Sequence, residues 1–424
     1  MAAAGRPPAL PITGVNADPP RRRRFPASFL PRRGPPAARP PDFLRESPWM
    51  KVICDRRVLI DALALMGGVV LTRTPKPVLS CVKLTAAAPD AAEPGLTLEA
   101  TDAEISVRLR SERVEVAEAG ESLLPADKLQ SIVRESIDST ITLATDGDVT
   151  LVTGSDSKFR IFGQPVGDFP AVAAFPGEPD FKIKAGELHR LIAQTLFATA
   201  RENSRYAING VLFERAGQQV TVVATDGHRL ALAKGRCAAT DGGADETVRS
   251  SIVPAKTLNL LLRLFDDAEQ EVEVKLADNR IHFRTDLAVL ASSLVEGNFP
   301  PYADVIPKDG DKKATLPTDG FISAVRRAAL LTNEESKGVR MAFEEGGLKL
   351  TSRAPEMGEA EVTLPLPEYT GDALEIGFNP AYLLDALKVV DEEKLQFEFK
   401  APNKPGVMRT GPDFLYVVMP VNLS

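Results

Sequence analysis

Cysteine and histidine are scarce in this chain of 424 residues, and their scarcity narrows its chemistry. The three cysteines, Cys54, Cys81 and Cys237, are odd in number and none has the C-x-x-C spacing, which argues against a disulfide framework and a zinc site. Three histidines are too few for a histidine-rich metal centre. We therefore expect no metal, no cofactor and a reducing, cytoplasmic environment.

Long apolar runs and phosphate-binding loops are also missing. No run approaches the roughly 18 apolar residues of a membrane-spanning helix, so no membrane partner is expected. The sequence contains no glycine-rich phosphate loop and no serine, histidine and acid arrangement typical of a catalytic triad. The apolar fraction of 44% and the charged fraction of 26% are those of a globular protein.

Charge is distributed unevenly along the chain. Residues 1–49 hold nine arginines against three acidic residues, a net +6, so residues 50–424 carry −13 to reach the total of −7. With twelve prolines besides, this segment buries too little apolar surface to offset its ordering entropy, and we expect it to be disordered. Three interpretations stay open: a transit peptide, a basic nucleic-acid tail, or an upstream extension that is not translated. We favour the last because Met50 begins the first of three repeats.

Three stretches of sequence, 50–176, 177–306 and 307–424, run through the same order of elements. Each opens with an apolar strand and an amphipathic helix, at 52–67, 181–196 and 314–330. Each carries a second helix midway, and the prolines that begin these helices, Pro125, Pro254 and Pro380, are 129 and 126 residues apart. Such a period is too long for a solenoid unit, so we predict three copies of one domain.

Between the helices the sequence alternates between apolar and polar residues, as in TITLATDGDVTLVTG (140–154) and EVEVKLADNRIHFRTD (271–286). Period-two alternation broken by Asp-Gly or Asp-Asn is typical of antiparallel hairpins. We expect seven or eight strands and two helices in each block. Because short turns join consecutive strands, a βαβ sheet is excluded. The predicted fold class is α+β, with antiparallel sheets and two helices collected on one side.

The helices carry basic residues on the faces that their apolar stripes leave open. The open faces predicted for the first helix of each block hold Arg56, Arg57 and Asp61, then His189, Arg190 and Gln194, then Arg326 and Arg327. The second helices add Lys128 and Arg134, Lys256 and Arg263, and Lys388. For any one helix a solvated surface explains this. The same bias on six helices of an acidic protein favours a surface that meets a polyanion.

The string ATDGHRLALA (224–233) offers Asp226 and His228 as an acid–base pair. We interpret it instead as a hairpin turn at Asp226-Gly227, because the corresponding string ATDAEISVRLR (100–110) has no histidine. No catalytic residue is therefore expected. The apolar tail 416–421 predicts either a last strand or, with its methionine, one wall of a peptide groove.

Five segments in combination resemble a known family: RYAINGVLFE (205–214), ATDGHRLA (224–231), NFPPYADVIP (298–307), EIGFNPAYLLDAL (375–387) and YVVMP (416–420). With the triplicated pattern they resemble the bacterial DNA polymerase III β subunit, the replicative sliding clamp. The resemblance covers residue 50 to the end. It implies three tandem DNA-clamp domains that close, in a head-to-tail homodimer, as a ring of six domains.

The same resemblance implies a non-catalytic processivity factor. Helices would line the hole, duplex DNA would be contacted at its phosphates without sequence readout, and a pocket would carry a clamp loader and DNA polymerases by their clamp-binding motifs. Carried over residue by residue, the peptide pocket comprises Ile208, Thr225, Gly227, His228, Arg229, Leu230, Pro300, Val305, Asn379, Tyr382, Val417, Met419 and Pro420. Asp304 departs from the family at its rim, where relatives can carry arginine.

DNA-contacting positions carried over from the family are Arg73, Arg205 and Tyr206. Glu202 and Ala207 depart from it there, standing where relatives can carry glutamine and a second tyrosine. For the dimer contact, the resemblance implies that Phe159 packs near Leu330 and Leu331 of the other subunit.

Two other functions remain open at this point. One is a three-domain, β-rich scaffold that binds only proteins and does not encircle DNA. The other is an enzyme that uses Asp226 and His228.

Overall fold

The structure, a computed structural model, describes residues 50–200, 208–240, 248–265, 267–277, 279–332, 338–366 and 368–422. The segment 1–49, which we expect to be disordered, lies outside the described residues. Within the described part of the chain, no helix is long and apolar enough to cross a membrane.

The first block opens as its sequence predicts. Strand β1 (Met50–Asp55) leads into α1 (Arg56–Gly67), whose first turn is capped by the Asp55 carboxylate. That carboxylate accepts the backbone N–H groups of Arg57 and Val58 at 2.8 and 3.2 Å. The remaining elements are η1 (Pro77–Ser80), β2 (Cys81–Ala87), β3 (Gly95–Thr101), β4 (Ile105–Ser111), β5 (Val114–Glu118), β6 (Gly120–Pro125), α2 (Ala126–Glu135), β7 (Thr140–Asp146), β8 (Val149–Thr153), β9 (Lys158–Phe162) and η2 (Val166–Asp168).

The second block repeats this order. Its elements are β10 (Phe181–Lys184), α3 (Ala185–Ala193), η3 (Leu196–Ala198), β11 (Gly210–Ala216), β12 (Gln219–Thr225), β13 (Arg229–Arg236), β14 (Ala238–Ala239), β15 (Arg249–Pro254), α4 (Ala255–Leu261), β16 (Glu271–Ala277), β17 (Arg280–Arg284), β18 (Ala288–Ser293) and η4 (Tyr302–Asp304).

The third block follows the same plan. Its elements are β19 (Lys312–Pro317), α5 (Thr318–Ala328), η5 (Ala329–Leu331), β20 (Val339–Glu344), β21 (Gly346–Ala354), β22 (Gly358–Leu366), β23 (Glu368–Thr370), β24 (Leu374–Phe378), α6 (Pro380–Leu387), β25 (Lys394–Phe399), β26 (Gly406–Thr410) and β27 (Phe414–Val418).

The predicted α+β class with antiparallel sheets is confirmed, but the predicted number of strands in each block was too low. The described residues form nine strands in each block rather than seven or eight. The excess includes β14 and β23, which span two and three residues and are therefore too short to show a period of two.

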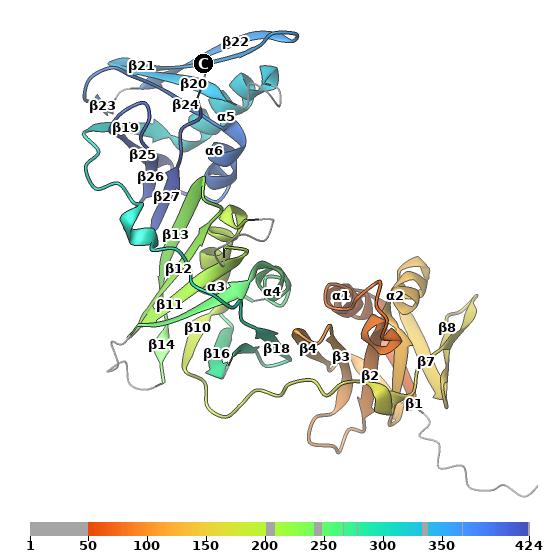
Figure 1. The fold of residues 1–424 in the computed structure, drawn as a ribbon. Coiled ribbons are helices and arrows are strands. Elements are labelled where there is room, and N and C mark those ends of the chain that lie inside the picture. Colours follow the sequence, from red (N-terminus) through yellow and green to blue (C-terminus); the bar gives the residue numbers. More distant parts are fainter. Residues whose placement is uncertain are drawn as a thin grey trace, which may run out of the picture. The chain divides into compact units, whose positions relative to one another are not determined.

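Two of the four sheets run across block boundaries, which the sequence pattern did not predict. One nine-stranded sheet contains the pair β18 and β4, and the other contains β13 and β27 (Figure 1). In each case the ninth strand of one block pairs with the fourth strand of the block before it. Each of the four sheets ends in two edge strands. The edge strand β9 is the ninth strand of its block and β22 is the fourth strand of its block, so they are equivalent to the strands that pair at the block boundaries, and we call these two the open edges.

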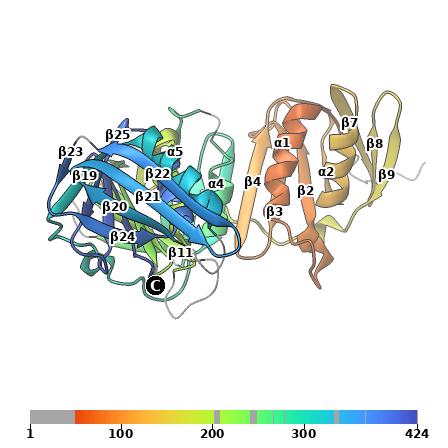
Figure 2. The same cartoon turned by 90° about the horizontal axis from the view of Figure 1, so that it is seen from above.

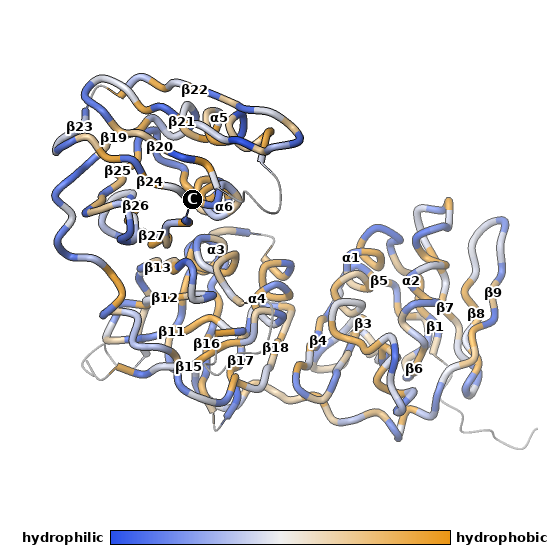
Figure 3. The backbone as a smooth tube through the Cα atoms, turned by 45° about the horizontal axis from the view of Figure 1, so that its top comes forward, coloured by the Kyte–Doolittle hydropathy of each residue, from blue (hydrophilic) through white to orange (hydrophobic). Residues whose placement is uncertain are grey.

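The helices pack on the sheets through apolar stripes. In the first block α1 and α2 lie side by side over the strands, with Leu59, Leu63 and Leu129 buried between them and the sheet (Figure 2). Along the strands hydrophobic and hydrophilic residues are interleaved, as expected for sheets with one buried face (Figure 3). This arrangement directs the polar faces of the helices away from the core.

The predicted open faces need correction at three residues. Gln194 is buried, with 6% of its surface exposed, because α3 ends at Ala193 and the helical period does not extend beyond it. Arg190 is held by Glu187, Gln194 and the Lys234 carbonyl. Arg56 donates to the Val133 and Arg134 carbonyl oxygens at the end of α2. The other residues predicted on these first helices, Arg57, Asp61, His189, Arg326 and Arg327, are exposed.

Candidate functional site

The turn between β12 and β13 lies where the second block meets the third, and side-chain hydrogen bonds hold it together. Gly227 adopts φ +87°, which favours glycine, and the Asp226 carboxylate accepts the N–H groups of His228 and Arg229 at 2.9 and 3.0 Å. The Thr225 hydroxyl closes the turn by donating to the Arg229 carbonyl oxygen at 2.7 Å. The Asp226 carboxylate therefore has a structural role in forming the turn.

The first block contains the same turn. Thr101 donates to the Ile105 carbonyl oxygen at 2.9 Å, and Asp102 accepts the N–H groups of Glu104 and Ile105 at 3.0 and 2.7 Å. The position of Gly227 is held by Ala103, also with positive φ, at +81°. Since the turn recurs without its histidine, the acid–base interpretation of Asp226 and His228 loses its support.

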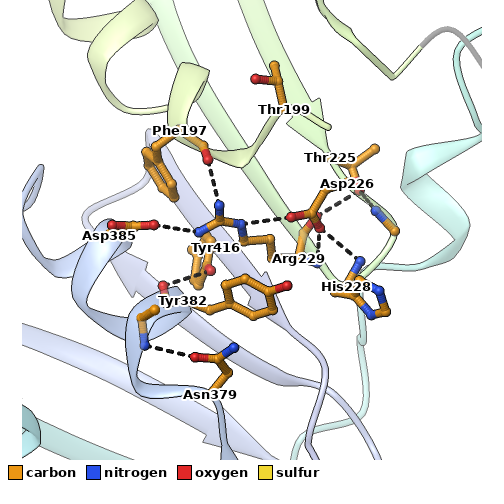
Figure 4. A network of polar contacts seen from close by, with 12 residues as sticks. Phe197, Thr199, Thr225, Asp226, His228, Arg229, Asn379, Tyr382, Asp385 and Tyr416 are labelled. Carbon is orange, nitrogen blue, oxygen red and sulfur yellow. Dashed lines mark hydrogen bonds and ion pairs between the residues drawn. The ribbon is translucent and has the colours of Figure 1, made fainter. Parts of the chain in front are cut away.

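Arg229 is the centre of a buried polar network that joins three segments (Figure 4). Only 8% of its side chain is exposed, and it donates to Asp226 at 3.0 Å, to Asp385 at 2.9 Å and to the Phe197 carbonyl oxygen at 2.7 Å. Its guanidinium also lies 4.5 Å from the Tyr382 ring centre. Burial disfavours the charged form, but the two carboxylates outweigh it and raise the pKa of Arg229. Arg229 therefore acts as a fixed cation.

Helix α6 supplies the opposite side of the site. The Asn379 side chain caps the helix by accepting the Ala381 N–H at 2.9 Å, and the Tyr382 ring stacks near His228 with centroids 6.4 Å apart. Burial raises the pKa of Tyr416, which stays neutral and donates its hydroxyl to the Tyr382 carbonyl oxygen at 2.9 Å. The turn, α6 and β27 are thus fixed relative to one another.

The C-terminal tail borders the same turn. The Met419 N–H donates to the His228 carbonyl oxygen at 2.9 Å, while 42% of the Met419 surface is exposed. Below it, Leu230 and Val417 belong to an apolar cluster covered by Val295, Phe299, Tyr302 and Ile306 of the segment between the second and third blocks. An exposed methionine beside a small apolar cluster can receive apolar side chains of a partner.

The connecting segment is tied to the sheet beside this cluster. The Tyr302 hydroxyl donates to the Glu214 carboxylate at 2.6 Å, and Pro300 lines a hollow of about 850 Å³ between this segment and strands β11 and β15. Val305 follows η4 and is 57% exposed, and Asp304 is exposed as well. The apolar Val305 is therefore accessible to a partner.

The structure brings together most of the predicted pocket residues. Thr225, Gly227, His228, Arg229 and Leu230 form the turn and the start of β13; Asn379 and Tyr382 begin α6; Val417, Met419 and Pro420 form the tail. Ile208 is buried farther back, where its carbonyl oxygen accepts the Ala200 N–H. In the described part of the chain, Ile208, Pro300 and Val305 lie outside the hydrogen-bond network of Arg229. That the predicted residues together form a peptide pocket remains a prediction for the whole set.

Sequence reasoning missed three residues that hold the network together: Phe197, Asp385 and Tyr416. Asp385 had a usable signal, because it lies three residues after Tyr382 on a helix and so shares its face. Phe197 and Tyr416 contribute a carbonyl acceptor and a buried hydroxyl from segments far away in sequence. No local pattern identifies such roles.

The predicted DNA contacts are only partly described. Arg73 is exposed in the segment between α1 and η1, as a phosphate contact requires. Arg205 and Tyr206, together with Glu202 and Ala207, lie outside the described residues. Among the residues that the structure does cover, no group of acidic, histidine or cysteine side chains is arranged to hold a metal ion.

The predicted dimer residues lie on the two open sheet edges. Phe159 is in the edge strand β9 and is 42% exposed. Leu330 in η5 is 72% exposed. The next residue, Leu331, lies beside the edge strand β22, because a Cβ built on Gly358 would be 3.7 Å from its side chain. Both edges thus carry accessible apolar side chains.

Comparison with known proteins covers all three blocks. Family profiles of the DNA polymerase III beta subunit match its N-terminal domain at residues 50–173, its central domain at 182–301 and its C-terminal domain at 303–422. The beta sliding clamp of Pseudomonas putida is 36% identical over 377 residues, which are 88% of this chain and 100% of that protein. That of Escherichia coli is 34% identical over 348 residues, 82% of this chain and 92% of that protein.

Solved structures agree with this comparison. The crystal structure of a sliding clamp from Pseudomonas aeruginosa bound to griselimycin has a TM-score of 0.79 at 34% identity and covers 88% of this chain and 100% of its own. The Bacillus subtilis sliding clamp, at 24% identity over the same shares, has a TM-score of 0.80, which speaks for the fold alone. With its three blocks matched in order, the chain belongs to the DNA polymerase III beta subunit family, the sliding clamps.

Proposed function

We propose that two copies of this chain close head to tail into a ring that encircles duplex DNA and holds polymerases on it. Membership of the family makes the chain a DNA sliding clamp and not an enzyme. The observation that carries the ring is the complementarity of the two open sheet edges. The proposed domains are 50–176, 177–306 and 307–424.

The edge argument follows from the sheet order. Each nine-stranded sheet consists of five strands from one block and four strands from the block before it. The two parts join where the ninth strand of the later block pairs with the fourth strand of the earlier block. The unpaired halves are the five-stranded sheet ending in β9, the ninth strand of the first block, and the four-stranded sheet ending in β22, the fourth strand of the third. Pairing β9 of one copy with β22 of another repeats the same junction and leaves neither edge open.

The side chains on these edges support that pairing. Strand β9 alternates Lys158 and Arg160 with Phe159, whereas β22 carries Glu359 and Glu361 on one face. Opposite charges on neighbouring strands attract, and each such pair contributes about 0.2–1 kcal/mol. Phe159 would meet the apolar surface of Leu330 and Leu331, as proposed for the dimer contact. The same junction twice gives a closed ring of six domains.

Contact with DNA is proposed through the helices and the loops beside them. Arg57, Arg326 and Arg327 are exposed on the first helices of two blocks, although the described chain is acidic overall. Arg73, and by family resemblance Arg205 and Tyr206, would add contacts to phosphates. Such contacts carry no sequence information and permit sliding.

Partner proteins are proposed to bind at the junction of the second and third domains. A linear motif with apolar anchors would place them beside Met419, Val417 and Leu230, with Tyr382 and His228 at the rim. The clamp loader and DNA polymerases that carry clamp-binding motifs are the proposed partners. We propose that the protein acts in the cytoplasm.

The ring is tested by loading purified protein on nicked circular DNA with a loader and then linearising the circle. We expect the protein to stay on the circle and to leave the linear DNA by its ends. Retention on linear DNA with free ends would contradict encirclement, and failure to load on the circle at all would favour the protein-binding scaffold.

The edge pairing is tested separately by native mass measurement. Arg160→Glu should shift the chain toward monomer, and so should Glu359→Arg. An equimolar mixture of the two variants should recover dimer through one repaired junction. Arg134→Glu, at an exposed arginine of helix α2 outside the strands β9 and β22, is the matched control. If both edge variants remain as dimeric as this control, β9 and β22 do not form the interface.

A further inference from the structure

Two loops of the first block meet the side chain of Lys256, the second residue of α4 in the second block. Its ammonium lies 2.6 Å from the Asp102 carboxylate in the turn between β3 and β4. The same ammonium lies 3.4 Å from the carbonyl oxygen of Val69, in the segment that follows α1. One lysine of the second block thus joins two separate segments of the first.

The ion pair is well shielded on its acidic side. Only 9% of the Asp102 side chain is exposed, against 46% of the Lys256 side chain. The second oxygen of Asp102 already accepts the N–H groups of Glu104 and Ile105. A shielded carboxylate that loses its cation is left with an uncompensated charge, so this contact matters more than a pair between two exposed side chains.

The internal repeat explains why this junction needs a lysine. Pro254 and Pro380 begin equivalent helices, so Lys256 corresponds to Tyr382 at the next junction. There, Asp226 obtains its cation from Arg229 in the same turn. In the first block the position of Arg229 is held by Ile105, which has no charge, and Lys256 supplies the cation from the neighbouring block.

The segment after α1 is packed closely against the same helix. A Cβ on Gly68 would lie 2.6 Å from the Leu260 side chain, and Val69 is fully buried. The Val70 N–H donates to Met66 at 3.1 Å and the Leu71 N–H donates to Leu79 at 3.0 Å. Arg73 follows two residues later and is exposed. The segment that Lys256 contacts at Val69 therefore continues through Val70 and Leu71 directly toward Arg73.

We propose that Lys256 is a positioning residue, which holds the segment 68–71 from the second block and thereby sets the place of Arg73 on the DNA-facing side. The first step stands on the contacts of this chain. The second rests on the proposed function, because it takes Arg73 to contact DNA.

Hydrogen exchange on the full-length protein tests the first step without DNA. Lys256→Met should accelerate exchange at the amides of Val70 and Leu71 about tenfold. Lys128→Met is the matched control, because Lys128 stands in the first turn of α2 and its ammonium pairs with the adjacent Asp127 of the same helix at 3.1 Å. Asp102→Asn, which removes the charge but keeps the acceptor oxygen of the turn, should reproduce the acceleration. Unchanged exchange in both Lys256→Met and Asp102→Asn would overturn the proposal.

A double-mutant cycle with Arg73→Ala tests the second step by the dissociation constant for a DNA duplex at low salt. If Lys256 acts through Arg73, Lys256→Met weakens binding several-fold in the wild-type background and has little further effect after Arg73→Ala. Losses that multiply would make Lys256 an independent phosphate contact and overturn the positioning role in DNA binding. Accelerated exchange with no change in DNA affinity for Arg73→Ala would leave the positioning intact and refute the DNA role of Arg73.

Discussion

The paired turns at 101–105 and 225–229 allow one prediction to be made in both directions. Ala103 has a φ of +81°, a conformation that costs a residue with a Cβ roughly 1–2 kcal/mol. Glycine removes that cost but loses about 0.4–1 kcal/mol through the greater freedom of the unfolded chain. Ala103→Gly should therefore stabilise the first-block turn by about 0.5–1 kcal/mol.

Gly227→Ala is the reverse experiment in the second block. A Cβ built on Gly227 meets nothing within 4 Å, so a steric clash is excluded and only the φ of +87° remains as a cost. We expect Gly227→Ala to destabilise its turn by about 0.5–1 kcal/mol, the same amount with the opposite sign.

Native-state hydrogen exchange is the appropriate assay, because it reports the local stability of each block separately in a chain of three blocks. The predicted energies correspond to exchange roughly two to five times slower in β3 and β4 for Ala103→Gly, and as much faster in β12 and β13 for Gly227→Ala. Exchange in the other block serves as the control for each variant. Faster exchange after Ala103→Gly would refute the reasoning, since it would mean that the positive φ carries no strain.

Three further predictions concern the site and the core. Met419→Glu should reduce the affinity for a synthetic clamp-binding peptide at least about tenfold by placing a charge on the apolar surface, with the dimer unchanged by native mass. Arg229→Met should lower the local free energy of opening of β12 and β13 by about 2–4 kcal/mol in native-state hydrogen exchange, because Asp226 and Asp385 lose their shared cation. Burial raises the pKa of the Cys54 thiol from 9.0 to about 12, so Cys54 should resist thiol reagents at pH 8 until the protein unfolds.

Each of these has a result that would contradict it. Unchanged peptide affinity in the Met419 variant would remove Met419 from the pocket. Val421→Glu, two residues farther along the tail, where the N–H donates to the Gly377 carbonyl oxygen, provides a control. Equal stability after Arg229→Met would mean that the network contributes little. Burial favours the neutral thiol of Cys54. The stability that this thiol contributes to the folded protein is therefore complete below pH 9 and is lost as the pH rises toward about 12. Rapid labelling of native protein at pH 8 would contradict the burial.

Local periodicity explains why so much of the fold could be predicted. The second helix of each block begins at or next to its predicted proline, and the hairpins follow the period-two segments, because caps, turns and one-sided burial are encoded within a few residues. The errors occur where local information ends. Gln194 was read as exposed because the period of α3 was extended past its last residue, and β14 and β23 are too short to leave a pattern.

The site divides in the same way. The turn at Asp226-Gly227 was readable, since an aspartate before a glycine forms it from its own backbone bonds. The pocket as a set came from family resemblance. In the network of Arg229 with Phe197, Asp385 and Tyr416, the bond from Arg229 to Asp385 alone joins residues 156 apart, and no periodicity reports such a contact.

By itself the sequence determined the three repeats, their order of strands and helices and the turns, because each depends on residues close together in the chain. Only the tertiary structure decided how the blocks join: β4 with β18, β13 with β27, and the edges β9 and β22 left open. Strand pairing across blocks uses backbone groups that every residue has, so its specificity lies in the shape of whole sheets. The same holds for Lys256, whose partners become visible only when two blocks are packed together.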